Sequence, residues 1–221
     1  MFTNPQEDYA RGFVPFLDCT IFLDSRPLIP RIETEYWVEC AIAEMRARFP
    51  DNGVVRVLDL FAGSGAIGVA VLKHLAGARA DFGEIDAIHL PTIKKNIREN
   101  GIALERTCVI KTDVWSAVGG VYDAVLANPP YLAESRRGHI QESVLAEEPA
   151  QALFADEDGL ALIRTTIEGA KAHLTPGGVL YIEHDPEQAG AIERIGKENG
   201  LSIETQKDQF GVLRYSTIRV A

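Results

Sequence analysis

Apolar runs that alternate with stretches of helical spacing begin near residue 54, and this alternation constrains the fold more than any other feature of the sequence. The runs are apolar almost throughout, which is typical of strands buried on both faces of a parallel sheet. The predicted strands are residues 54–60, 80–85, 107–111, 122–127 and 179–183. The predicted helices are residues 65–76, 87–100, 159–174 and 186–199. The repeated strand–helix unit indicates a sheet with helices on both faces.

Both ends of the chain depart from this repeat. The last two predicted strands, 202–206 and 212–220, are too close in sequence to enclose a helix, so they must pair antiparallel. The expected fold is α/β, with a doubly wound, mostly parallel, seven-stranded Rossmann-like sheet that ends in this antiparallel hairpin. The other expectations are an irregular arm at 1–12, a short β-hairpin at 13–24, a helix at 34–49 capped by Thr34 and stopped by residues 50–53, and an irregular segment at 132–157. Residues 1–33 would form an N-terminal arm and hairpin, and residues 34–221 the main domain.

The composition excludes several classes of protein. The 221 residues include 32 acidic and 22 basic side chains, a formal charge of −10, and such a surface argues against a general nucleic-acid binder. The three cysteines lack the spacing of a disulfide framework or a zinc site, so no metal is expected. The sequence shows no signal peptide and no apolar run long enough to cross a membrane, which favours a cytoplasmic protein.

A glycine-rich loop follows the first strand of the repeat. Gly63, Gly65 and Gly68 form G-x-G-x-x-G between a predicted strand and a predicted helix. The N-terminus of a helix favours an anion such as a pyrophosphate. Asp59 precedes the glycines, and a carboxylate there would repel pyrophosphate and favour a cationic ligand such as S-adenosylmethionine. Glu84 ends the second strand, where a carboxylate can accept hydrogen bonds from ribose hydroxyls. A nicotinamide cofactor and a tight turn without a ligand stay open as alternatives.

Asp113 and Val114 follow the third predicted strand and could bind an adenine amino group and pack on its ring. A helix cap is the alternative role for Asp113. The predicted cofactor-binding residues are Asp59, Phe61, Ala62, Gly63, Ser64, Gly65, Glu84, Ile85, Asp113, Val114 and Asn128.

The most specific motif is Asn128-Pro129-Pro130-Tyr131, at the end of a predicted strand. Two prolines cannot continue a strand ladder and they fix the backbone. Here the chain resembles class I S-adenosylmethionine-dependent methyltransferases that act on amino groups. In such a site the Asn128 side-chain oxygen and the Pro129 carbonyl would each accept one N–H of a planar –NH2 group, Tyr131 would stack on it, and the nitrogen lone pair would point at the methyl group. Catalysis would then be mostly alignment, which can supply about 7–11 kcal/mol.

A second segment narrows the resemblance to one family. Residues 28–35, L-I-P-R-I-E-T-E, resemble the L-I-P-R-P-[ED]-T-E segment of the release factor glutamine methyltransferases. Further agreement lies in Glu148-Pro149, Asp158-Gly159-Leu160, Pro176-Gly177-Gly178, Glu183 with Gln188, and Asp208, Gly211 and Arg214. The resemblance implies methyl transfer to the side-chain amide nitrogen of a glutamine in the Gly-Gly-Gln loop of a peptide chain release factor, in a domain spanning residues 34–221.

The same resemblance implies the roles of the remaining residues. The catalytic residues would be Asn128, Pro129, Pro130 and Tyr131. The substrate-binding residues would be these four with Pro30, Arg31, Glu33 and Thr34, although Arg31 and Glu33 could equally form a structural ion pair. The chain departs from the family at Ile32, which replaces a proline, and we expect it to lack the family's N-terminal helical domain.

Local charge bears on the choice of substrate. Residues 131–160 carry seven acidic and two basic side chains, which favours a protein substrate over a nucleic acid, although a solvated acidic loop explains the charge as well. We expect a monomer with a release factor as its partner and no membrane partner. The alternatives are an amino-methyltransferase acting on adenine or guanine of DNA or RNA, a nicotinamide oxidoreductase, and a non-catalytic binding subunit.

Overall fold

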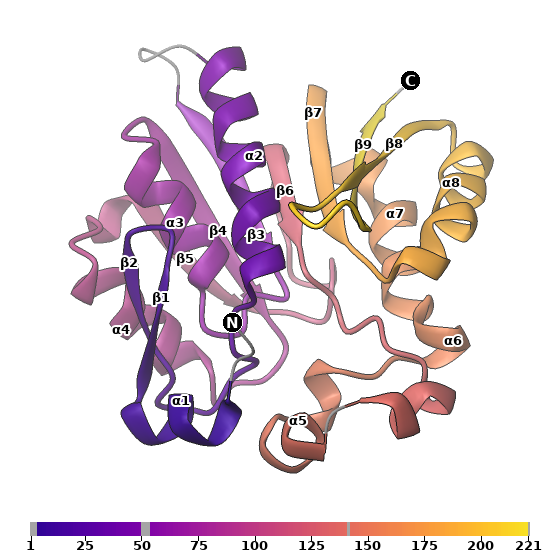
Figure 1. The fold of residues 1–221 in the computed structure, drawn as a ribbon. Helices are drawn as coiled ribbons and strands as arrows, with labels where there is room; N and C mark the ends of the chain where they lie inside the picture. The colour runs from indigo at the N-terminus through magenta and orange to yellow at the C-terminus, as the bar shows by residue number, and fades with distance from the viewer. Residues whose placement is uncertain (1–3, 50–53, 141, 221) are drawn as a thin grey trace.

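A mixed seven-stranded sheet in the order β5-β4-β3-β6-β7-β9-β8 forms the centre of the molecule (Figure 1). The computed structural model describes residues 4–49, 54–140 and 142–220. Strands β3 to β7 pair in parallel, whereas β9 is antiparallel to both β7 and β8. The strands are β3 (Val55–Leu60), β4 (Ala78–Glu84), β5 (Thr107–Lys111), β6 (Tyr122–Ala127), β7 (Leu174–Glu183), β8 (Leu201–Lys207) and β9 (Leu213–Val220). The predicted fold, including the C-terminal antiparallel hairpin, is confirmed.

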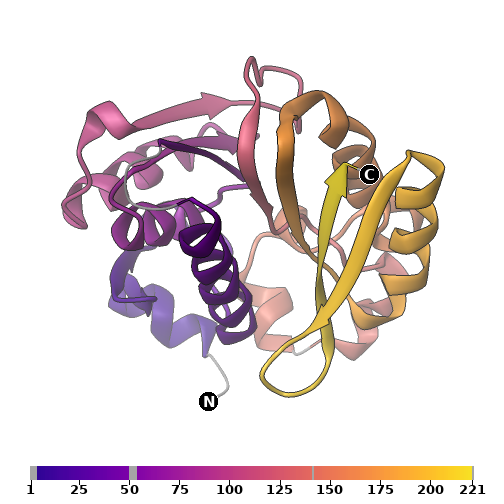
Figure 2. The same cartoon turned by 90° about the horizontal axis from the view of Figure 1, so that it is seen from above.

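Helices cover both faces of this sheet, as the apolar strands require (Figure 2). One face packs against α2 (Ile32–Arg48), α3 (Ala66–His74) and α4 (Leu90–Glu99), and the other against α7 (Ala161–His173) and α8 (Ala189–Glu198). Each side has its own core, with fully buried Trp37, Val69 and Ile93 in the first and Ile163 and Ile192 in the second. The switch between the two layers places the carboxyl ends of β3, β4 and β6 where ligands bind in such folds.

The N-terminal segment is more ordered than the sequence predicts. Strands β1 (Phe13–Phe16) and β2 (Cys19–Phe22) form the predicted hairpin, and its inward side chains join the core that contains Trp37. The expected irregular arm is wrong over residues 5–11, which form helix α1 (Pro5–Arg11). Pro5 suits the first turn of a helix, and Gly12 ends α1 in the left-handed conformation. Tyr9 ties α1 to the chain ahead, because its hydroxyl donates a hydrogen bond to the Pro27 carbonyl at 2.6 Å.

Helix α2 begins earlier than predicted. Arg31 is its N-cap residue, so Thr34 lies inside the first turn and the prediction that Thr34 caps the helix is wrong. The hydroxyl of Thr34 instead donates to a side chain on β7, described below. The predicted stop at residues 50–53 lies outside the described residues.

The segment between β6 and α7, which we call the bridging segment (residues 132–159), was expected to be irregular over residues 132–157. It contains short helices instead: η2 (Glu134–His139), α5 (Glu142–Glu147), η3 (Ala150–Ala152) and α6 (Asp156–Gly159). The final predicted helix is likewise split, into η4 (Pro186–Gln188) and α8. Figure 1 places α5 beside α1, at the carboxyl ends of the strands. Arg26 pairs with Glu147 of α5 at 2.6 Å, so the bridging segment is anchored to the N-terminal part of the chain.

None of the helices over the described residues combines the length and apolarity that a bilayer-spanning helix needs.

Candidate active site

Three adjoining cavities lie at the carboxyl ends of the parallel strands. The large cavity has a volume of about 510 Å³, the narrow cavity about 120 Å³ and the central cavity about 90 Å³. The large and central cavities share the lining residues Phe61, Ile85, Pro130 and Gln151. The central and narrow cavities share Leu28, Asn128 and Ala152. The central cavity therefore connects the other two, and Asn128 stands at the junction with the narrow one.

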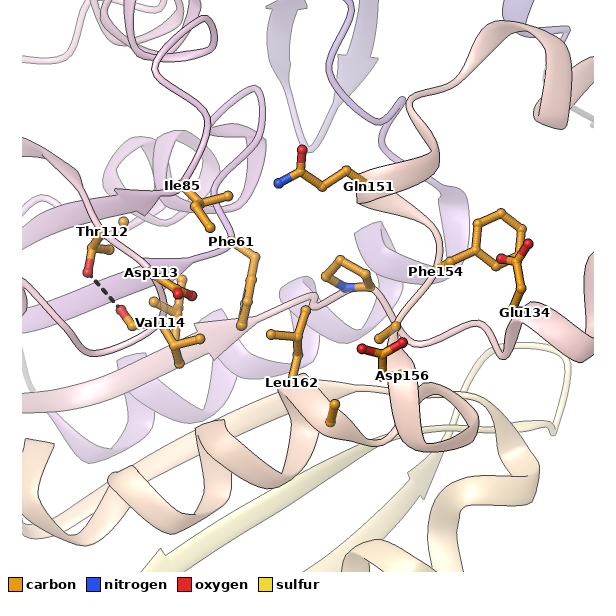
Figure 3. A pocket seen from close by; sticks show the side chains of 15 residues that line it. Phe61, Ile85, Thr112, Asp113, Val114, Glu134, Gln151, Phe154, Asp156 and Leu162 are labelled. Atoms are coloured by element: carbon orange, nitrogen blue, oxygen red, sulfur yellow. Dashed lines mark hydrogen bonds between the residues drawn. The ribbon is translucent and has the colours of Figure 1, made fainter.

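Apolar side chains from four elements enclose the large cavity (Figure 3). Phe61 follows β3, Ile85 follows β4, Val114 follows β5 and Leu162 comes from α7. Asp113 lies beside them, and the bridging segment adds Gln151 and the carboxylates of Glu134 and Asp156. This lining of apolar walls with few polar groups is typical of a small-molecule site of this size.

Two residues of this lining have left-handed backbone conformations. Phe61 has φ 65° and Val114 has φ 45°, and neither is a residue type that adopts this region readily. The Thr112 hydroxyl donates to the Val114 carbonyl at 3.0 Å and holds the second of these turns. Strained residues of this kind cluster at ligand sites, because the surrounding fold must hold them there.

Asp59 lies beneath the glycine loop and not at the mouth of the site. Its side chain is fully buried, Oδ2 accepts the Gly68 N–H at 2.9 Å, and Asp59 is not among the lining residues of the three cavities. Burial raises the pKa of the carboxyl to about 8, and the nearby Glu84 charge adds to the shift. Contrary to the prediction, Asp59 does not present a carboxylate to the cavities, because its side chain is buried and holds its proton at neutral pH.

This placement makes the stability of the protein depend on pH. The pKa of Asp59 is about 8 in the folded protein, against about 3.9 in an unfolded chain. Its contribution to the free energy of unfolding is therefore complete below pH ~4 and is lost as the pH rises to ~8. Asp59→Asn should remove this loss, which is on the order of a few kcal/mol. Urea unfolding from pH 4 to 8 measures it, and Glu198→Gln, on an exposed position of α8, is the control. An Asp59→Asn protein with the wild-type pH slope would contradict this placement.

The remaining residues of the glycine loop differ in position. Gly63 lines the central cavity, whereas Ala62, Ser64 and Gly65 are not among the lining residues of the three cavities. Gly65 caps α3 with φ 79°, and a Cβ there would approach Ile93 at 3.1 Å, so this turn favours glycine. The Ser64 carbonyl accepts the Asn96 amide at 2.8 Å, which fixes the loop against α4.

Glu84 joins the glycine loop to the central cavity. Its Oε2 accepts the Gly63 N–H at 2.7 Å and its Oε1 accepts the Asp86 N–H at 2.8 Å. The side chain is buried but lines the central cavity together with Asn128. A carboxylate has about four acceptor positions, so Glu84 can accept further donors from a ligand while it holds both loops.

The motif at residues 128–131 surrounds the junction of the cavities. Asn128 Nδ2 donates to Thr34 Oγ1 at 3.5 Å, whereas Asn128 Oδ1 is buried and has no hydrogen-bond partner among the described residues. Pro129 and Tyr131 line the narrow cavity, and Pro130 lines the large and central ones. A buried acceptor without a donor is costly unless a ligand supplies one. Asn128 Oδ1 is therefore placed to accept an N–H from a bound group.

Glu183, the last residue of β7, connects the motif to α2. It is 1% exposed, and its carboxylate accepts hydrogen bonds from Thr34 Oγ1 at 2.7 Å, Trp37 Nε1 at 2.6 Å and Tyr131 Oη at 3.0 Å. Burial raises the pKa of Glu183, although these three donors act in the opposite direction. Glu183 was not among the predicted site residues. The available signal was an acidic residue at the end of an otherwise apolar strand.

The predicted substrate-binding segment is only partly at the cavities. Arg31 and Thr34 approach the motif, but Pro30 and Glu33 are half-buried and are not among the lining residues of the three cavities. Arg31 Nη2 contacts both carboxylate oxygens of Glu148 at 2.6 and 2.8 Å, and the Glu148 side chain is fully buried. The structural ion pair considered for Arg31 thus forms with Glu148 of the bridging segment and not with Glu33.

The described ranges, 4–49, 54–140 and 142–220, hold no group of three or more His, Cys, Asp or Glu side chains arranged for a metal ion.

Comparison with known proteins finds methyltransferases both by sequence and by structure. A family model described as Methyltransferase small domain matches residues 44–156. A release factor glutamine methyltransferase of Lactococcus lactis subsp. lactis is 30% identical over 218 residues, 98% of this chain and 78% of that protein. A protein of the same name from Neisseria gonorrhoeae is 35% identical over 207 residues, 93% of this chain and 73% of that protein. The crystal structure of a ribosomal protein L11 methylase from Lactobacillus delbrueckii subsp. bulgaricus superposes with a TM-score of 0.63 and 21% identity, covering 88% of this chain and 82% of that chain, and shows the shared fold.

Proposed function

Because the chain belongs to the release factor glutamine methyltransferase family, we propose that it methylates the side-chain amide nitrogen of a glutamine in a peptide chain release factor. The methyl donor is S-adenosylmethionine, and the glutamine is that of the Gly-Gly-Gln loop. The observation that carries the proposal is the buried, unpartnered Oδ1 of Asn128, at the junction between the central and narrow cavities.

The central and large cavities fit the methyl donor. Glu84 retains acceptor positions for ribose hydroxyls, and the apolar wall of Phe61, Ile85, Val114 and Leu162 suits an adenine ring with Asp113 at its edge. Gly63 brings backbone to the central cavity without a side chain. Bound there, S-adenosylmethionine supplies an electrophilic methyl group on its sulfonium. We propose these residues as its site. Ala62, Ser64 and Gly65 would give the glycine loop its shape, and Asp59 would support the loop from beneath.

The narrow cavity fits the glutamine side chain. The nitrogen of a carboxamide is a poor nucleophile because its lone pair is delocalised into the carbonyl. Asn128 Oδ1 and the Pro129 carbonyl would each accept one N–H of the glutamine, and the Tyr131 ring would hold the amide plane, so that the lone pair faces the central cavity. These residues align the nitrogen, and alignment is the main contribution that the chain makes to the reaction.

Several contacts support Tyr131 in this role. Its hydroxyl is held by Glu183, and its backbone carbonyl accepts Gln188 Nε2 at 2.8 Å. Burial raises the pKa of the Tyr131 hydroxyl far above its ordinary value, with the Glu183 charge adding to the shift, so the ring stays neutral at any physiological pH. The ring is therefore a fixed neutral surface for a planar group.

A labelling assay tests the proposed reaction and its substrate class together. The protein is incubated with methyl-labelled S-adenosylmethionine and, in separate reactions, a release factor, its Gly-Gly-Gln→Gly-Gly-Ala variant, tRNA and DNA. We expect label in the wild-type release factor alone. Equal labelling of the alanine variant would contradict glutamine as the acceptor, and label in tRNA or DNA would favour the nucleic-acid alternative. We also propose that the chain acts as a monomer in the cytoplasm, where its proposed substrate works.

A further inference from the structure

We propose that Glu183, acting through Thr34, is a positioning residue that determines which end of the Asn128 amide faces the substrate. This inference deepens the proposed function and rests on it for the identity of the substrate. The three side chains come from separate parts of the chain: Glu183 from β7, Thr34 from α2 and Asn128 from the end of β6. They meet only in the folded protein, 149 residues apart in the case of Thr34 and Glu183.

The direction of these hydrogen bonds, from donor to acceptor, follows from the single proton on the Thr34 hydroxyl. The Thr34 hydroxyl has one proton, and the buried Glu183 carboxylate, which only accepts, takes it at 2.7 Å. Thr34 Oγ1 can then only accept from Asn128. The Asn128 group that faces Thr34 at 3.5 Å must therefore be its NH2 end. The reversed amide would set two acceptor oxygens against each other.

The consequence falls at the reacting end of the amide. With its NH2 end on Thr34, Asn128 presents Oδ1 to the cavities, and this is the oxygen that has no partner among the described residues. An acceptor there matches a substrate –NH2 group, which donates. The reversed amide would present a donor to that group and would hold the glutamine nitrogen away from its productive position.

The side chains around Glu183 keep its orientation fixed. Trp37 Nε1, which can only donate, contacts the same oxygen as Thr34, and the indole stacks on Tyr215 with ring centroids 5.9 Å apart. Tyr131 donates to the other oxygen. Arg214 of β9 acts on this carboxylate as a positive charge, and it is paired with Asp208 at 3.1 Å. The two donors on the Thr34 side hold this oxygen of Glu183 as an acceptor.

Thr34→Val tests the proposal with little change in shape. We expect kcat to fall roughly 10- to 100-fold with a release factor as substrate, because a misplaced reacting group costs rates of that order. The Kd of S-adenosylmethionine and the unfolding midpoint should change little. Thr34→Ser restores the hydroxyl and should restore most of kcat. Thr166→Val removes another buried hydroxyl, which donates to its own helix at the Leu162 carbonyl, and should leave kcat unchanged.

Two variants of Glu183 distinguish a role in orienting Asn128 from a purely structural role of this side chain. In Glu183→Gln the Trp37 N–H should keep the carboxamide oxygen on the Thr34 side, so kcat should stay within about fivefold of wild type, a change of about 1 kcal/mol. Glu183→Leu removes the acceptor and should lower kcat at least as much as Thr34→Val does. Adding Thr34→Val to Glu183→Leu should lower kcat no further, since the two residues act in series.

A spectroscopic measurement tests this hydrogen-bond relay, from Glu183 through Thr34 to Asn128, even if the release factor is not the substrate. The side-chain NH2 signals of Asn128 in an amide-proton NMR spectrum are identified by their loss in Asn128→Ala. They should shift and exchange faster with water in Thr34→Val, but not in Thr166→Val. An inactive wild-type protein whose Asn128 signals respond in this way would contradict the proposed function and leave the relay standing. An active protein in which Thr34→Val changes neither kcat nor these signals would overturn the relay alone.

Discussion

Asn128→Ala should lower kcat roughly 100- to 1,000-fold, because it removes a buried acceptor without a partner among the described residues, at the junction of the central and narrow cavities. The loss of a group that aligns a reacting nitrogen acts on the chemical step. In the proposed site S-adenosylmethionine contacts mainly Glu84 and the apolar wall of the large cavity, so we expect its Kd to rise only a few fold. Steady-state kinetics with a release factor and calorimetry with the cofactor measure the two effects separately.

Asn199→Ala is the matched control for this substitution. Asn199 ends α8, and its side chain donates to the Ile195 carbonyl of the same helix at 2.9 Å. Its removal should leave kcat within about twofold of wild type, since surface substitutions have small effects. A kcat for Asn128→Ala close to that of the control would show that Asn128 does not align the reacting group.

Gly159→Ala should produce the largest loss of stability among the substitutions considered. Gly159 has φ 84°, and a Cβ there would lie 2.0 Å from the Tyr131 carbonyl oxygen and 2.7 Å from Gln188 Nε2. The left-handed conformation and the overlap together should lower the free energy of unfolding by about 2–5 kcal/mol. Relief of the overlap requires the Tyr131 backbone to move, so kcat should fall as well.

Gly101→Ala separates the two causes of this loss. Gly101 has φ 70°, but a Cβ there meets no other atom within 4 Å. It should therefore cost only about 1–2 kcal/mol, with kcat unchanged. Urea unfolding and kinetics of both variants measure the difference. Equal losses for the two variants would mean that the approach of Gly159 to Tyr131 does not constrain the motif.

The buried sheet was the most predictable part of the fold. Strands β5 and β6 begin and end at the predicted residues. The bounds of β6 show in the sequence because most of this strand is buried and apolar, whereas β5 is a half-exposed strand at the edge of the sheet. Helix α1 and the short helices of the bridging segment were not predicted. They are held by tertiary contacts between particular side chains, such as that from Tyr9 to Pro27, which leave no periodic pattern in the sequence.

The site was predictable at its motifs and not at the contacts between them. Asn128, Glu84 and Val114 are at the cavities, but Asp59 is buried beneath the glycine loop. Position along a strand places a residue at the correct end of the sheet but does not show which way its side chain points. The role of Glu183 depends on Thr34, which approaches it only through the packing of α2 on the sheet.

The acidic residues of the bridging segment have a structural role that the sequence did not predict. Three of its acidic residues, Glu147, Glu148 and Glu157, pair with arginines from outside the segment, namely Arg26, Arg31 and Arg164. Much of the local negative charge therefore anchors the segment over the site. It gives less support for a basic partner than the sequence count suggested, and the preference for a protein substrate rests on the family.

The central claim is that this site methylates a glutamine side-chain nitrogen, and the most direct test is to locate the methyl group. A release factor is incubated with the protein and S-adenosylmethionine, digested, and sequenced by tandem mass spectrometry, with the Asn128→Ala protein in parallel. We predict a single added methyl group on the glutamine of the Gly-Gly-Gln peptide, and almost none of it with Asn128→Ala. A methyl group on any other residue, or equal modification by the two proteins, would contradict this account.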